Sequence, residues 1–147
     1  MFRGLNNVLD KASVFAFAKK HNATLMIFSY FQVAEAGEYM KHLKGPIDII
    51  GFSRGARSAY ELADAHPNIQ IHRMITIGSF HTVTSSFGNG KRPPLKNVGE
   101  HRNYIESHQQ PEDFNKNPIN ISLGPTIHYD SVKKVLDILE KEESQCQ

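Results

Sequence analysis

The sequence IDIIGFSRGARSAY, residues 47–60, changes its pattern at Ser53. A short run rich in β-branched residues precedes this serine, and apolar residues at helical spacing follow it. The pattern predicts a buried strand, a sharp turn and a helix, with Ser53 at the turn. The Gly-x-Ser-x-Gly spacing fits such a turn, because a side chain at Gly51 or Gly55 would meet the backbone where strand and helix pass closely.

A serine at this turn has the position of a nucleophile. The turn places Ser53 at the N-terminus of the following helix, where free backbone N–H groups and the helix dipole stabilise negative charge on a substrate oxygen. The backbone N–H of Arg54 is therefore one expected oxyanion donor. The serine also needs a base to take its proton, and an imidazole does this best near neutral pH.

Predicted strands and helices alternate along the rest of the chain. Residues 23–31 are apolar on both faces and predict a central strand of a parallel sheet. Further strands are predicted at 70–78, 102–107 and 117–123, and helices at 7–20, at 36–43 and, with the cleanest apolar face, from Val132 onward. This order predicts one α/β domain over residues 1–147, a doubly wound, mostly parallel sheet of about five strands with helices on both faces.

Two segments are predicted to lie outside these elements. Residues 80–100 contain several glycines and prolines and predict an irregular insertion over the active-site edge of the sheet. The insertion is polar and basic, which argues against a membrane-docking lid. The polar tail, 142–147, is predicted to fray.

Composition limits the partners. The formal net charge is +2, from 17 basic and 15 acidic residues, so no field favours nucleic acid or an anionic membrane. The longest apolar run is shorter than the roughly 20 residues of a membrane span, and a soluble, cytoplasmic protein is expected. The single cysteine, Cys146, excludes a disulfide framework, and no histidine pair has metal-site spacing, so neither a metal nor another cofactor is expected.

The chain resembles the α/β-hydrolase superfamily and, within it, the lipase-like and esterase-like serine hydrolases. The resemblance rests on GFSRGA at 51–56, on MITIGS at 74–79 as the next strand, and on IHYD at 127–130 before the last helix. It implies a trimmed α/β-hydrolase fold and a catalytic triad with Ser53 as nucleophile. His128 is the implied base, because the base in this family lies between the final strand and the final helix.

The third triad member and the substrate contacts are less sharply indicated. Asp113 matches the family's usual position for the acid best, with Glu106 and Glu112 as alternatives. His81 is expected to line the pocket or contact the substrate, and Phe52, next to the nucleophile, is also expected to bind substrate.

The second oxyanion donor is expected from Gly4 or Leu5. In the family this loop follows an apolar strand, which is almost wholly missing here, with Phe2 as its possible last residue. An exposed sheet edge at that place would favour pairing with another chain, so a homodimer is one expectation.

The favoured function is hydrolysis of a carboxylic ester or thioester, a small-molecule substrate, through an acyl-enzyme. Arg54 and Arg57 beside the nucleophile indicate an anionic acyl or alcohol group. The alternative is that both arginines point to solvent from the helix, and this explanation is slightly favoured for Arg57. The alternative function is that of a catalytically degenerate hydrolase-fold protein that binds a ligand or partner. The missing first strand and the uncertain acid favour this alternative, whereas the retained glycines, Ser53 and His128 oppose it.

Overall fold

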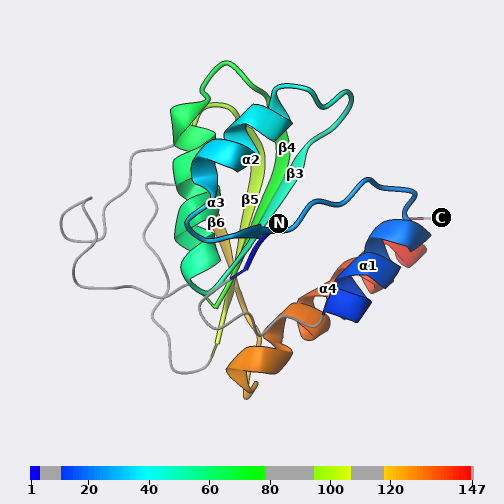
Figure 1. Cartoon of the computed structure of the whole chain (residues 1–147). Helices are drawn as coiled ribbons and strands as arrows, with labels where there is room; N and C mark the ends of the chain where they lie inside the picture. Colours follow the sequence, from blue (N-terminus) through cyan, green and yellow to red (C-terminus); the bar gives the residue numbers. More distant parts are fainter. Residues whose placement is uncertain (4–10, 79–94, 107–117, 147) are drawn as a thin grey trace.

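The computed structural model describes residues 1–3, 11–78, 95–106 and 118–146 (Figure 1). Six strands form one sheet in the order β2-β1-β3-β4-β5-β6, and each of the five pairings is parallel. The strands are β1 (Phe2–Arg3), β2 (Phe28–Ser29), β3 (Asp48–Phe52), β4 (Ile71–Ile77), β5 (Val98–Ile105) and β6 (Pro118–Ser122). The helices are α1 (Lys11–Lys20), α2 (Val33–Met40), α3 (Arg54–Ala65) and α4 (Ser131–Gln145), with the 3-10 turn η2 (His128–Asp130) before α4.

The helices lie on both faces of the sheet, as the sequence predicts. In Figure 1, α2 and α3 cover one face, while α1 and α4 lie together on the other. The first core joins α2 and α3 to residues such as Ile49 and Met74. The second joins α1 and α4 to residues such as Ile75 and Tyr104. The predicted α/β fold class is therefore confirmed, with six strands in place of about five.

The apolar segment 23–31 does not form the predicted central strand. Only Phe28–Ser29 are in strand conformation, and this strand, β2, lies at an edge of the sheet. The segment is apolar on both faces for another reason: Leu25 packs against the core under α1 and α4, and Phe28 packs against the core under α2 and α3.

Strand β1 has two residues and lies inside the sheet. Phe2 pairs with Phe28 on one side and with Gly51 on the other. The N–H of Phe28 donates to the carbonyl of Met1 at 2.8 Å, which extends the β1–β2 ladder by one bond. The exposed edge that was expected at this place is therefore not there, and within the described residues the edge strands are β2 and β6.

The start of β5, the end of α4 and the buried face of α1 differ from the predictions made from the sequence. Strand β5 begins at Val98, inside the segment 80–100 predicted to be irregular, and α4 continues to Gln145, where a frayed tail was predicted. In α1 the structure buries Val14 and Ala18, whereas Phe15, on the predicted buried face, is 53% exposed. The segment from Ala12 to Ala18 is apolar nearly all round, so its periodicity does not select a face.

The register of the strands aligns their carboxyl ends. Phe52 of β3 pairs with Ile77 of β4, Ile77 pairs with Tyr104 of β5, and Tyr104 pairs with Ile121 of β6. Residues just beyond this row therefore meet at one edge of the sheet. None of the described helices is both long enough and apolar enough to cross a membrane.

Candidate active site

Ser53 occupies a strained turn between β3 and α3. Its backbone angles are φ 57° and ψ −123°, which side-chain-bearing residues rarely adopt. The turn is held by the N–H of Ser53, which donates to the carbonyl of Ile77 at 2.9 Å, and by the N–H of Ala56, which donates to the carbonyl of Ser53 at 3.1 Å. Strain of this kind costs of order 1–3 kcal/mol and is typical of functional sites.

The two glycines of the motif are required by close backbone approaches. A Cβ at Gly51 would lie 2.6 Å from the Cα of Ala56, in the first turn of α3. A Cβ at Gly55 would lie 2.7 Å from the carbonyl carbon of Phe2. The predicted tight strand–turn–helix geometry is therefore confirmed, and the short strand β1 forms part of the support for the turn.

His128 and Glu106 form a hydrogen-bonded pair at the same edge of the sheet. Glu106 follows β5 directly, and His128 begins η2 after β6. His128 Nδ1 lies 2.6 Å from Glu106 Oε1, and the hydroxyl of Ser131 donates to the same oxygen at 2.7 Å. Glu106 and Ser131 have no exposed surface, whereas the His128 side chain is 23% exposed. The carboxylate is thus buried behind an imidazole that faces the surface.

Phe52 orients the ring of His128. The two rings stack with their centroids 4.7 Å apart and an interplanar angle of 29°. Phe52 is only 2% exposed and belongs to the core under α4. Phe52 therefore supports the imidazole from the residue that precedes Ser53, and its expected role in substrate binding stays a prediction.

Gly78 lies between β4 and the histidine–glutamate pair. Its φ is +55°, and a Cβ there would lie 3.1 Å from His128 Cε1 and 2.5 Å from Glu106 Oε1. The N–H of Gly78 donates to the carbonyl of Tyr104 at 3.0 Å, which fixes the glycine beside the end of β5. A glycine at this position leaves the space that the two side chains occupy.

The hydrogen bonds assign the roles of the two imidazole nitrogens. An ionised carboxylate only accepts hydrogen bonds, so Nδ1 of His128 carries the hydrogen that is donated to Glu106. In a neutral imidazole with this tautomer, Nε2 is the atom with the lone pair. Among the described residues no hydrogen bond joins the Ser53 hydroxyl to His128, and nucleophile–base bonds are often long before a substrate is bound.

Arg54, the expected oxyanion donor, lies at the N-terminus of α3, and its role stays a prediction. The N–H of Arg54 belongs to the first turn of a 12-residue helix, where backbone N–H groups have no intrahelical acceptor. The remaining predicted site residues, Gly4, Leu5, His81 and Asp113, lie outside the described residues, as does the alternative acid Glu112.

Sequence reasoning missed two residues of this site and ranked another too low. Glu106, kept only as an alternative, is the carboxylate that contacts His128. Ser131, whose hydroxyl donates to Glu106, was not among the predicted site residues, although its place three residues after the base was a usable signal. Gly78 carried the signal of a glycine directly after an apolar strand.

The fold and the site define a parallel α/β protein with a serine on a strained turn and a histidine–glutamate pair at the same edge of the sheet. Comparisons of this chain with protein-family models, with curated proteins and with solved structures find no match. The function is therefore argued from the chemistry of the site.

Proposed function

We propose that this protein is a serine hydrolase that cleaves a carboxylic ester or thioester through an acyl-enzyme on Ser53. The observation that carries the proposal is the 2.6 Å hydrogen bond between His128 and Glu106, at the sheet edge where Ser53 occupies its strained turn. A base oriented by a buried carboxylate, next to a serine at a helix N-terminus, is what nucleophilic acyl transfer requires.

The proposed reaction has two halves. In the first, Ser53 Oγ attacks the acyl carbon, His128 Nε2 takes the hydroxyl proton, and the Arg54 N–H stabilises the developing oxyanion. The imidazolium then gives its proton to the departing alcohol or thiol. In the second half a water attacks the acyl-enzyme with His128 again as base, and the carboxylic acid and free Ser53 are released. Glu106 stays ionised and stabilises the imidazolium in both halves.

The topology supports this proposal and the resemblance to α/β-hydrolases. The serine, the acid and the base follow β3, β5 and β6 in that order along the chain, and the same order holds in that superfamily. The strand order reverses between β1 and β3, and ligands of open α/β sheets bind at the carboxyl ends of the strands at such a switch point. Ser53 lies at this point.

Labelling with a fluorophosphonate probe tests the proposal. The wild type should be labelled on Ser53, as located by peptide mapping, and Ser53→Ala and His128→Gln should each lower the labelling rate at least about a thousandfold. His72→Gln is the matched control, because His72 lies near the amino end of β4 and contacts Asp48 at 3.0 Å. An unlabelled wild type with the circular dichroism and cooperative unfolding of a folded protein would exclude the hydrolase.

That negative outcome would favour the second candidate function, a hydrolase-fold protein that binds without turnover. This alternative requires the fold and the strained turn at Ser53 but no activated serine. The two candidates differ in one respect that can be measured: only the hydrolase forms a covalent adduct whose rate depends on His128.

A further inference from the structure

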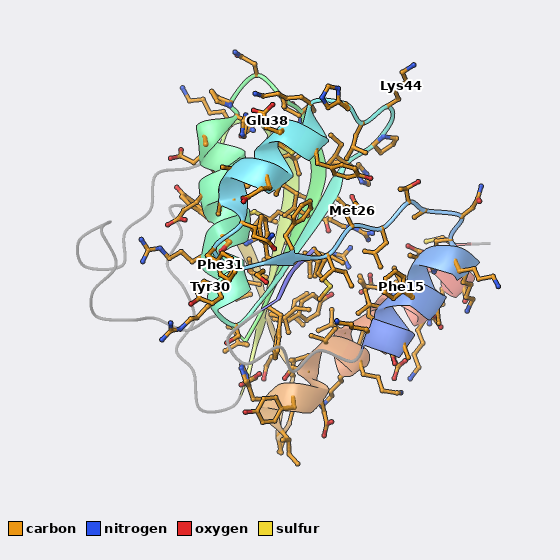
Figure 2. The ribbon with its side chains drawn as sticks, in the orientation of Figure 1. Phe15, Met26, Tyr30, Phe31, Glu38 and Lys44 are labelled. Carbon is orange, nitrogen blue, oxygen red and sulfur yellow. The ribbon has the colours of Figure 1, made fainter. Side chains whose placement is uncertain are left out.

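An aromatic turn lies at the same edge of the sheet as the candidate active site. Tyr30 and Phe31 follow β2 directly, and their rings meet edge to face, with centroids 5.5 Å apart and an interplanar angle of 87°. Figure 2 shows the two residues next to each other beside the lower end of α3. Phe31 is 72% exposed, so most of its side chain is accessible to a ligand.

The turn is rigid because its ends are fixed by hydrogen bonds. The N–H of Gln32 donates to the carbonyl of Ser29 at 2.9 Å, and the N–H of Ser29 donates to the Gln32 side-chain oxygen at 2.7 Å. The hydroxyl of Ser58, on α3, donates to the carbonyl of Tyr30. The aromatic pair is thereby attached to the helix that begins at the nucleophile.

Arg54 links this turn to Ser53. Its guanidinium carbon lies over the Tyr30 ring, 5.7 Å from the centroid, within the range of a cation–π interaction. Within the described residues no carboxylate pairs with Arg54. Arg57 differs, because its Nε lies 2.6 Å from Glu61 Oε1. The positive charge next to the nucleophile is therefore held in place by an aromatic ring and remains available to an anion.

The spacing of these groups defines the size of a ligand. The ends of β2 and β3 are separated by β1, so Tyr30 and Ser53 lie about two strand spacings apart, roughly 10 Å. We propose that Arg54, Tyr30 and Phe31 select the substrate: an ester or thioester whose acyl part carries a carboxylate, bound by Arg54, and a planar apolar ring, packed on the two aromatic side chains. This inference rests on the proposed hydrolase activity and specifies its substrate class.

A matched pair of esters tests whether the Arg54 guanidinium binds the substrate carboxylate. The first substrate is monoethyl 3-phenylglutarate, and its neutral counterpart has a primary amide in place of the free carboxylate. The wild type should prefer the carboxylate, and Arg54→Gln should lower the ratio of the two kcat/KM values about tenfold, since a hydrogen bond to a charged group is worth that much or more. Arg57→Gln makes the same charge change one turn further along α3 and should leave the ratio unchanged. An equal ratio in wild type and Arg54→Gln would overturn the inference.

Substrates with a phenyl or a cyclohexyl ring test whether the aromatic turn binds a planar ring. The cyclohexyl analogue of the first substrate has similar bulk but no planar face. Phe31→Leu should lower the phenyl-over-cyclohexyl ratio of kcat/KM about threefold, in line with the energy of one aromatic contact. Because Phe31 is exposed, the substitution should leave the fold intact. An unchanged ratio would exclude the ring-binding role.

Two readouts separate failure of this inference from failure of the proposed function. Fluorophosphonate labelling of the wild type reports the activated serine whatever the substrate, and the control variant Arg57→Gln should still be labelled. A labelled protein that does not distinguish the matched esters keeps the hydrolase and loses the substrate class. If the wild type is not labelled, calorimetry with 3-phenylglutarate tests whether the site still binds the proposed ligand class. Arg54→Gln should then weaken binding about tenfold. No binding to the wild type would overturn this inference as well.

Discussion

Glu106 and His128 are joined by a 2.6 Å hydrogen bond between Oε1 and Nδ1, although β6 lies between them along the chain. Three features fix this pair: the register of β5 against β4, the stacking of His128 on Phe52, and the hydroxyl of Ser131. The orientation of the candidate base is therefore set by elements that belong to the core rather than to the surface.

Glu106→Gln tests the orienting carboxylate. Glutamine has nearly the same shape but no charge, and it can hold the imidazole in the wrong tautomer, so the rate of fluorophosphonate labelling should fall about 10²- to 10⁴-fold while the protein remains folded. Ser131→Ala removes a donor but keeps the carboxylate and should lower the rate about tenfold or less. Asp113→Asn should leave the rate unchanged. If Asp113→Asn abolishes labelling and Glu106→Gln does not, the assignment of the acid is reversed.

Gly78→Ala separates the geometry of the site from the stability of the fold. Both Gly78 and Gly124 have positive φ, +55° and +66°, so alanine at either position should cost about 1–2 kcal/mol in the free energy of unfolding. At Gly124 a Cβ would meet nothing within 4 Å, whereas at Gly78 it would displace Glu106 and His128. Labelling should therefore fall at least tenfold in Gly78→Ala only. Equal labelling in both variants would contradict the placement of the pair.

The strain at Ser53 predicts that Ser53→Gly is more stable than Ser53→Ala. Glycine adopts φ 57° and ψ −123° readily, whereas alanine keeps the strain of the wild type. Ser53→Gly should therefore be about 1 kcal/mol more stable than Ser53→Ala in urea unfolding, even though glycine loses more backbone entropy on folding. Neither variant should be labelled. The opposite order of stability would show that the turn is relaxed.

Gly51→Ala should be far more damaging than an ordinary glycine substitution. Its Cβ would overlap the backbone of α3, and neither side can shift without moving a core element, so we expect a loss of about 3 kcal/mol or more in the free energy of unfolding. Gly45→Ala serves as the control, because Gly45 has a φ of +93° but open space around it. Its cost should stay near 1 kcal/mol. Similar losses in the two variants would mean that α3 is not held against β3.

The sequence predicted the fold class and the turn at Ser53 because both depend on local patterns. Apolar runs and helical spacing give the order of elements, and two glycines around a serine between a strand and a helix restrict the backbone there. The position of His128 before the last helix also followed from this order, and its catalytic role stays a prediction.

The acid could not be selected in the same way. Whether Glu106 or Asp113 faces the base depends on the register and on the last residue of β5, and the sequence placed that strand at 102–107 instead of Val98–Ile105. The same limit explains 23–31, where an edge segment that packs into two cores has the pattern of a central strand. Contacts between distant segments decide both cases, and single-sequence periodicity does not contain them.

The interior place of the two-residue strand β1 has a consequence for the order of folding. Phe2 is 1% exposed, with β2 and β3 on either side and Gly55 against its backbone. At about 5–20 residues per second, the ribosome needs roughly 2–9 s to synthesise the chain between Arg3 and Asp48, and during that time this strand has no partner on the β3 side. The support for the turn at Ser53 is thus completed only when β3 has been synthesised, and until then the Phe2 side chain lacks this cover.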